Sequence, residues 1–204
     1  MTLEDLLHYK DIVIQCHDDP DADAIASGYA LLKYLESKGK FSRLVYSGGR
    51  KVTKNNLLLM IEKLNIPLEY VRKTDDETEL LITVDCRAGQ RNVSALPHQT
   101  LVVIDHHELD MGEVLPELCE VRTDCSACVT VIWTMLKKAG FPIEDRLLST
   151  ALYYGLSWIP KSLRAPRNWT GKCWTPCGLI GTSFSCSRAR TWPCMISVPQ
   201  AAPL

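Results

Sequence analysis

The feature that most constrains the fold is an apolar run that ends abruptly in a cluster of side chains able to bind metal ions. Residues 12–14 read Ile-Val-Ile, and His17 and four aspartates, from Asp18 to Asp23, follow within a few positions. A short β-branched run predicts a buried strand, and the pattern after it predicts a helix over residues 22–37. So much negative charge is costly unless cations neutralise it. No cluster of lysine or arginine stands beside it, so the stretch predicts one or two hard metal ions.

Strands and helices are expected to alternate along most of the chain. Strands are predicted over residues 11–16, 43–46, 68–71, 80–85, 101–107 and 119–122, and helices over residues 22–37, 53–64, 126–138 and 143–155. This alternation is typical of an α/β fold with a mainly parallel sheet and right-handed connections. We therefore expect a Rossmann-like α/β domain, its sheet flanked by helices.

Three of the predicted strands end in side chains that bind metal ions. The first is followed by His17, Asp21 and Asp23, another by Asp85, and a third by Asp105, His106 and His107. The carboxyl ends of parallel strands share one edge of the sheet, so side chains about ninety positions apart can meet there. Carboxylate with imidazole suits manganese, iron, zinc or magnesium. Each group alone has an ordinary explanation, such as helix capping by an aspartate. The prediction of a metal site depends on the combination of all three strand ends.

A central aspartate at such an edge can bridge two ions. Asp85 would do so with His17 and Asp21 on one ion and with Asp23 and His106 on the other. Two ions roughly 3.5–4 Å apart activate a bridging water and stabilise in-line displacement at phosphorus. The pattern therefore predicts a two-metal phosphoester hydrolase.

In order and spacing these residues resemble the DHH phosphoesterase family. The segments that carry the resemblance are His17-x3-Asp21-x-Asp23, Val84-Asp85 and Asp105-His106-His107. The resemblance covers residues 10–156. Family members are manganese-dependent phosphohydrolases. They include oligoribonucleases that also cleave 3′-phosphoadenosine 5′-phosphate, cyclic-dinucleotide phosphodiesterases, single-strand exonucleases and inorganic pyrophosphatases.

The resemblance also implies roles for individual residues. The metal ligands would be His17, Asp21, Asp23, Asp85 and His106, holding two Mn²⁺ ions, with Mg²⁺ or Co²⁺ as alternatives. His107 would face the phosphate and assist the leaving group, and Asp105 would orient a histidine. Ser126 would either donate to phosphate or cap the helix that follows it.

The composition changes sharply after residue 156. All 24 acidic residues precede Ser157, and the last 48 residues hold six of the eleven prolines and four of the five tryptophans. The family's fourth motif would place Asp-Thr here, where the chain reads Ser157-Trp158-Ile159-Pro160. In a neighbouring reading frame any codons for Trp-Ile-Pro encode aspartate followed by threonine, serine or proline. We therefore expect a frameshift near Ser157, which sequencing of independent clones would test.

That hypothesis divides the chain into two parts. Residues 1–156 would be an incomplete DHH catalytic domain, without one ligand of the second metal and without the C-terminal substrate-binding domain. Residues 157–204 would be an aberrant, disordered tail. The activity of the chain is then expected to be low or absent, and a catalytically inactive nucleotide-binding remnant is the alternative.

Net charge, hydropathy and cysteine content limit the kinds of partner and the compartment that we expect for this chain. A net charge of −1 gives no support for a long electrostatic track along nucleic acid. No apolar run approaches the roughly 20 residues of a membrane span, and the first ten residues do not resemble a signal peptide. The nine scattered cysteines argue against a disulfide framework. We expect a cytoplasmic enzyme for a small nucleotide or short oligonucleotide, with no membrane partner. Inorganic pyrophosphatase and cyclic-dinucleotide phosphodiesterase are alternative activities, and monomer and homodimer both stay open.

Overall fold

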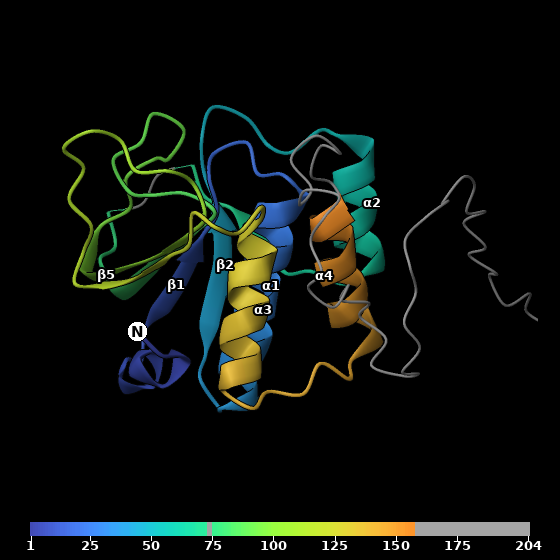
Figure 1. The fold of residues 1–204 in the computed structure, drawn as a ribbon. Coiled ribbons are helices and arrows are strands. Elements are labelled where there is room, and N and C mark those ends of the chain that lie inside the picture. The colour runs from blue at the N-terminus through green and yellow to red at the C-terminus, as the bar shows by residue number, and fades with distance from the viewer. Residues whose placement is uncertain (73–74, 158–204) are drawn as a thin grey trace, which may run out of the picture.

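A parallel β-sheet lies at the centre of the computed structural model, which describes residues 1–72 and 75–157 (Figure 1). Its six strands run in the order β3-β2-β1-β4-β5-β6, and each neighbouring pair is parallel. The strands are β1 (Ile12–Gln15), β2 (Ser42–Tyr46), β3 (Leu68–Tyr70), β4 (Thr78–Val84), β5 (His98–Asp105) and β6 (Leu118–Val121). The predicted α/β fold with a parallel sheet is confirmed. From residue 158 onward, the predicted tail lies outside the described residues.

The helices occupy the predicted places in the chain. They are α1 (Ala22–Ser37), α2 (Asn55–Lys63), α3 (Cys128–Lys138) and α4 (Arg146–Ser157). A short 3-10 helix, η1 (Leu3–His8), was not predicted, and it buries Leu3 and Leu6. β5 begins at His98 rather than at residue 101, because its polar first residues extend the strand by pairing with β4. Such residues carry no apolar signal in the sequence.

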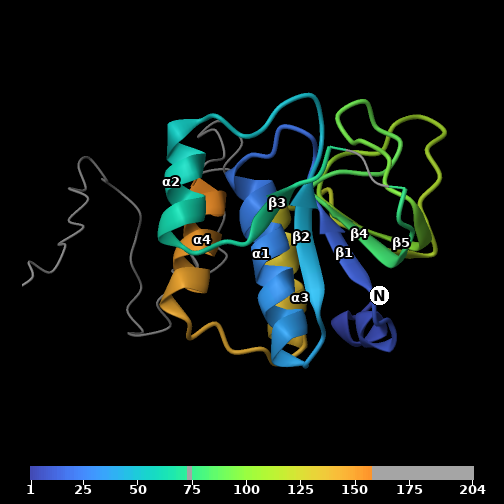
Figure 2. The ribbon, with the colours of Figure 1, turned by 180° about the vertical axis from the view of Figure 1, so that it is seen from behind.

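Successive residues of the central strands face opposite sides of the sheet. Ile12 and Ile14 join the main core, whereas Val13 between them joins a smaller cluster with Leu81 and Leu96. Helices α1, α3 and α4 pack together over the main core, as the two opposite views show (Figures 1 and 2). No helix among the described residues is long and apolar enough to cross a membrane. The cysteines of the described part, including Cys16 and Cys128, are free thiols.

Helix α4 approaches α1 closely at Gly155. A Cβ atom at this position would lie 2.8 Å from Val129 Cγ2, 2.9 Å from Ala26 Cβ and 3.0 Å from the carbonyl oxygen of Ala22. The last of these is backbone and cannot rotate away. Glycine is therefore required where α4 crosses the start of α1, beside the segment that carries Asp21 and Asp23.

We expect Gly155→Ala to destabilise the domain by about 1–3 kcal/mol, because the added methyl forces α4 away from α1. Urea unfolding of both proteins measures this difference. Gly49→Ala is the matched control, since a Cβ there meets nothing within 4 Å, and its effect should stay within about 0.5 kcal/mol. Equal stabilities of the two variants would contradict the tight α1–α4 crossing.

Candidate metal centre

The predicted ligands lie at the carboxyl edge of the sheet, at the point where the strand order reverses. β1 pairs with β2 on one side and with β4 on the other. Ligand sites of open parallel sheets form at such switch points. The register places Gln15 beside Thr83 and Val84 beside Ile104, so His17, Asp85 and the segment 105–107 emerge at the same edge. Strand pairing thus unites residues that are far apart in sequence.

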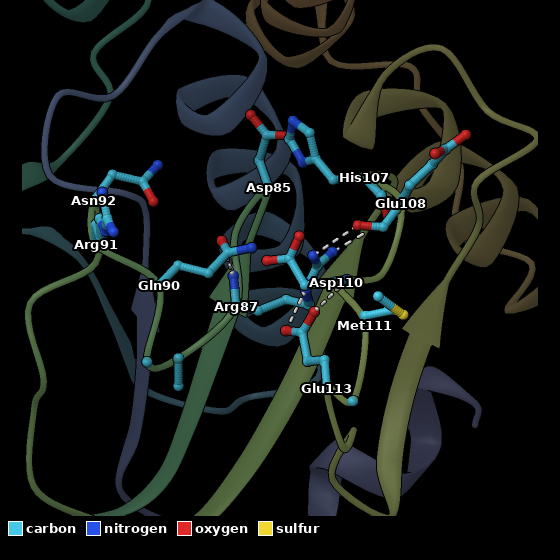
Figure 3. A pocket seen from close by; sticks show the side chains of 13 residues that line it. Asp85, Arg87, Gln90, Arg91, Asn92, His107, Glu108, Asp110, Met111 and Glu113 are labelled. Carbon is cyan, nitrogen blue, oxygen red and sulfur yellow. Dashed lines mark hydrogen bonds and ion pairs between the residues drawn. The ribbon is translucent and has the colours of Figure 1, made fainter.

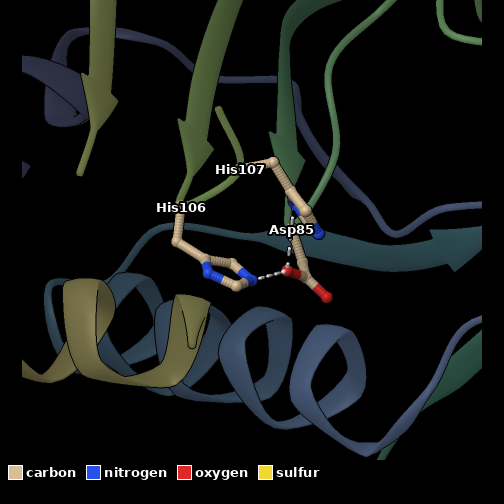
Figure 4. A group of neighbouring side chains, drawn as sticks. All are labelled: Asp85, His106 and His107. Carbon is tan, nitrogen blue, oxygen red and sulfur yellow. Dashed lines mark ion pairs between the residues drawn. The ribbon is translucent and has the colours of Figure 1, made fainter. Parts of the chain in front are cut away.

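Asp85 lies at the centre of this edge (Figure 4). Its Oδ1 atom lies 3.2 Å from His106 Nε2 and 4.0 Å from His107 Nδ1, and its Oδ2 atom lies 3.9 Å from His17 Nε2. Asp85 is 5% exposed and has a backbone φ of +59°, a conformation that is uncommon outside glycine and concentrated at functional sites. Oδ1 is buried and accepts no well-formed hydrogen bond, despite the nearby imidazole. A buried carboxylate oxygen without a hydrogen bond fits a position next to a metal ion.

The first candidate metal group comprises His17, Asp21 and Asp85, whose ligand atoms lie within 4.8 Å of one another. Asp21 is also the N-cap of α1. Its Oδ1 atom accepts hydrogen bonds from the backbone N–H groups of Asp23 (2.8 Å) and Ala24 (3.1 Å). These bonds hold the carboxylate in place and leave its second oxygen available to an ion.

The second candidate group comprises Asp85, His106 and His107, again with ligand atoms within 4.8 Å of one another. The Nδ1 atom of His106 lies 3.2 Å from the carbonyl oxygen of Cys125. Donation of the Nδ1 proton to this carbonyl would leave Nε2 free on the side of Asp85. Such a partner behind an imidazole is the usual way that a protein orients a metal-binding histidine. His107 appears in this group at the place where the sequence predicted Asp23.

Asp23 lies deeper than the other predicted ligands and has a structural partner. It is 6% exposed, and its two carboxylate oxygens accept the backbone N–H groups of Cys128 (2.9 Å) and Val129 (2.8 Å). The sequence offers Ser126 as a cap for the helix that follows it, but α3 begins at Cys128 and its N-cap, Ala127, has no side-chain acceptor. Asp23 supplies the capping hydrogen bonds instead. Asp23 Oδ2 nevertheless lies only 3.9 Å from His106 Nε2. Oδ1 also accepts the Ser27 hydroxyl at 3.4 Å, so it is Oδ2 that keeps a lone pair for an ion.

Behind His107, a buried chain of charged groups fixes the strand end. His107 Nδ1 lies 2.8 Å from Asp105 Oδ1, and Arg87 Nη1 donates to Asp105 Oδ2 at 2.6 Å. Arg87 also donates to Glu113 (2.7 Å) and to the backbone carbonyls of His107 and Glu108. The hydrogen bond from His107 to Asp105 agrees with the predicted orienting role of Asp105. The side chain of His107 itself is half exposed.

The pKa shifts follow from burial and from this crowding. Burial raises the pKa of Asp23 well above its ordinary value, and it also raises the pKa of Asp85. Burial disfavours the charged form of His106, but the Asp85 carboxylate outweighs this effect and raises the pKa to about 9. The hydrogen bond to Asp105 raises the pKa of His107, and the same contact lowers the pKa of Asp105 although burial opposes it. The raised pKa values mean that these side chains bind protons at the same place where a metal cation would be stabilised.

A cleft of about 870 Å³ opens beside these residues (Figure 3). Asp85 and His107 line it together with the β4–β5 segment around Arg91 and the β5–β6 segment around Asp110. The carboxyl edge of the sheet, which bears Asp85 and His107, therefore faces a cavity large enough for a small organic ligand.

Two of these structural roles were not predicted from the sequence. Arg87 was not predicted to anchor Asp105, although it stands only two positions after Asp85. Asp18 was not predicted to pair with Ser94, but its carboxylate accepts hydrogen bonds from the backbone and hydroxyl of that residue, both at 2.9 Å. Asp19 instead pairs with Lys54 at the surface. An arginine or aspartate in a predicted loop is usually exposed, so no local pattern marks burial or long-range pairing.

Comparison with known proteins agrees with this geometry. The model of the DHH family N-terminal domain matches residues 11–156. An uncharacterised protein of Methanocaldococcus jannaschii is 30% identical over 146 residues, which cover 71% of this chain and 29% of that protein. A probable manganese-dependent inorganic pyrophosphatase of Staphylococcus aureus is 24% identical over 137 residues, covering 67% of this chain and 44% of that protein.

The fold is also found in a solved structure. An exopolyphosphatase-related protein from Bacteroides fragilis superposes with a TM-score of 0.52 at 18% identity, covering 76% of this chain and 48% of that chain. This chain thus spans less than half the length of the curated relatives named above. The family match contains every predicted metal ligand, from His17 to His106, and also His107. The chain therefore belongs to the DHH family, with residues 11–156 forming its N-terminal domain.

Proposed function

We propose that this domain is a manganese-dependent phosphohydrolase acting on a small phosphate compound. The observation that carries the proposal is Asp85, a buried carboxylate that belongs to both groups of metal-binding side chains and whose Oδ1 atom accepts no well-aligned hydrogen bond. Membership of the DHH family and the manganese-dependent pyrophosphatase of S. aureus support both the reaction and the metal. Mg²⁺ and Co²⁺ are the alternatives.

The proposed ligands fall into two sets that share Asp85. His17 and Asp21 would hold one ion, and His106 would hold the second with Asp23 beside it. The carboxylate and imidazole donors suit manganese. Bound there, manganese would neutralise phosphate charge and activate a water molecule for attack on phosphorus.

His107 and Asp105 would act on the substrate side of the centre. Asp105 orients the His107 ring, which stands beside Asp85 at the mouth of the cleft. The hydrogen bond to Asp105 raises the pKa of His107 above its ordinary value and so favours the protonated ring, the form that donates a proton to a leaving oxygen. The chain thus holds both a metal-facing carboxylate and a general acid at one edge.

The substrate that we propose is a small nucleotide or a short oligonucleotide. The near-neutral net charge favours small substrates over long nucleic acids. Inorganic pyrophosphate is the second candidate, supported by the name of the S. aureus relative. Cyclic dinucleotides, a homodimeric state and a cytoplasmic location stay predictions.

We further propose residues 1–156 as the catalytic unit and residues 157–204 as a segment outside the family. The end of the family match at residue 156 supports this division. The place of the family's fourth motif, from Trp158 onward, lies outside the described residues. The lost second-metal ligand and the resulting low activity remain predictions.

Two assays on the full chain test the proposed function. Calorimetric titration with manganese should reveal bound ions. Hydrolysis assays with 3′-phosphoadenosine 5′-phosphate, a dinucleotide and pyrophosphate then identify the substrate class. Manganese binding without turnover of any of the three would support the inactive remnant, and absence of manganese binding would contradict the metal centre itself.

Manganese binding is expected to release at least one proton and to strengthen as the pH rises. His106, with its pKa of about 9, is protonated at neutral pH, and only the neutral ring binds a metal ion. The apparent affinity should rise by up to about tenfold per pH unit for each proton released, and level off above about pH 9. Calorimetry at pH 6, 7 and 8 in PIPES and Tris, whose ionisation enthalpies differ, measures both quantities. A constant affinity over this range would contradict the coupling.

A further inference from the structure

We propose that Arg91 binds a second phosphate group of the substrate, opposite the site where the scissile phosphate is held. The proposal rests on the proposed function and deepens it. It restricts the substrate to compounds with two phosphate groups, such as a diphosphate, a nucleoside bisphosphate or a 5′-phosphorylated dinucleotide. No single-phosphate ester would use this contact.

The position of Arg91 in the cleft is the first argument. Arg91 and Asn92 lie on the β4–β5 segment and line the same cavity as Asp85 and His107. Figure 3 shows them on the side of the cleft away from His107 and Glu108. A substrate whose scissile phosphate lies at Asp85 and His107 can therefore extend toward Arg91 within one cavity.

The second argument is the availability of its charge. Two arginines line the cleft, and the guanidinium of Arg87 is buried and engaged by Asp105, Glu113 and two backbone carbonyls. Arg91 is exposed, and its side chain forms no ion pair or hydrogen bond with any residue in the described part of the chain. Of the two guanidinium groups, only that of Arg91 can offer its hydrogen-bond donors to a phosphate.

The third argument is that the segment carrying Arg91 is tied to the metal-binding loop. The backbone N–H of Asp18 donates to the carbonyl of Asn92 at 2.8 Å, and the Asp18 carboxylate accepts both hydrogen bonds from Ser94. Gln15 at the end of β1 donates to the Ser94 carbonyl at 2.7 Å. These bonds involve the residues one and three positions after Arg91 and join its segment to the loop of His17. A segment held in this way loses little conformational entropy on binding.

The negative charge on the opposite wall of the cleft indicates on which side the second phosphate group binds. Glu108 and Asp110 line the cleft on the β5–β6 segment, and neither has a cationic partner among the described side chains within ion-pair distance. An anionic group is repelled from that wall and attracted to Arg91. Each phosphate group of the substrate then has a positively charged partner: the scissile phosphate has the metal centre, and the second phosphate has Arg91.

The test compares two non-hydrolysable ligands on the manganese-loaded full chain. Methylenediphosphonate has two phosphate-like groups, and methylphosphonate has one. Arg91→Ala should weaken methylenediphosphonate binding by about tenfold to a hundredfold, the usual effect of losing a hydrogen-bonded charge, and change methylphosphonate binding less than twofold. Arg91→Lys should retain part of the affinity because it keeps the charge. Calorimetry with excess manganese measures all these affinities.

Arg50→Ala is the matched control. Arg50 is 74% exposed, lies near the metal-binding loop through Asp19 and does not line the cleft, so both affinities should stay unchanged. Unaltered diphosphonate binding by Arg91→Ala, or an equal loss for both ligands, would overturn the subsite alone. A wild-type protein that binds manganese but neither ligand would contradict both the subsite and the proposed function.

Discussion

Asp85→Asn is expected to abolish manganese binding while leaving the fold intact. Asp85 is the shared member of both candidate metal groups, so its loss removes a ligand from each. Loss of a supporting partner alone costs about 10–100-fold in metal affinity, so we expect a larger loss here, and no detectable hydrolysis. Calorimetric titration with manganese and the three hydrolysis assays measure these effects.

The same variant should be at least as stable as the wild type without metal. Burial raises the pKa of Asp85, which means that folding disfavours its charged form. The sign follows from linkage: the folded state loses stability as the pH rises above the pKa of the unfolded aspartate, and neutral asparagine avoids this loss. Asparagine also tolerates the positive φ of this position.

Asp19→Asn is the control for this experiment. Asp19 is an exposed carboxylate of the same loop and pairs with Lys54 at 3.3 Å. Its loss should change manganese affinity only slightly, because the carboxylate is outside both candidate groups. If Asp85→Asn bound manganese as tightly as the wild type, the proposed centre would be wrong. If Asp85→Asn failed to fold, Asp85 would have a structural role that burial and charge do not predict.

Arg87→Met is expected to destabilise the domain by about 3–5 kcal/mol, the second large effect. The side chains of Arg87 and Asp105 are 3% and 0% exposed and lie 2.6 Å apart. Removal of the arginine leaves a buried carboxylate without its cation, and it frees the carbonyls of His107 and Glu108. Urea unfolding at neutral pH measures the loss in the free energy of unfolding.

Two further proteins make this test specific. Arg43→Met removes an arginine that contacts Glu69 at 2.7 Å on the surface, and such exposed pairs contribute about 0–1 kcal/mol. The double variant Arg87→Met/Asp105→Asn should recover part of the loss, because it no longer buries an unpaired charge. A cost below about 1 kcal/mol for Arg87→Met would show that the buried pair has no structural importance.

The predicted fold could be derived from the sequence because each element has a strong local pattern. The bounds of α1 agree at both ends, since Asp21 caps its start and the buried side repeats with the helical period. β1 and β4 are marked by β-branched and leucine runs. The start of β5 was placed three residues too late, because its polar residues belong to the strand only through pairing with β4.

Part of the candidate site could be predicted from the sequence for the same reason. Ligand-type side chains at three strand ends imply a common edge once the sheet is parallel, so the neighbours of Asp85 could be named in advance. The role of Asp23 as the hydrogen-bond acceptor at the start of α3 could not be predicted, because it depends on how α1 and α3 pack together. Equally, an arginine or aspartate in a predicted loop carries no local sign that it is buried.

The sequence by itself determined the parallel α/β sheet, the edge that bears the site and the residue types available to a metal ion, because strand patterns and strand ends are local properties. Only the tertiary structure decided which side chains touch. It joined Arg87 to Asp105 and Asp18 to Ser94, and it left the charge of Arg91 unpaired at the cleft. These contacts span segments separated along the chain, and their energies depend on distance and burial, which packing alone establishes.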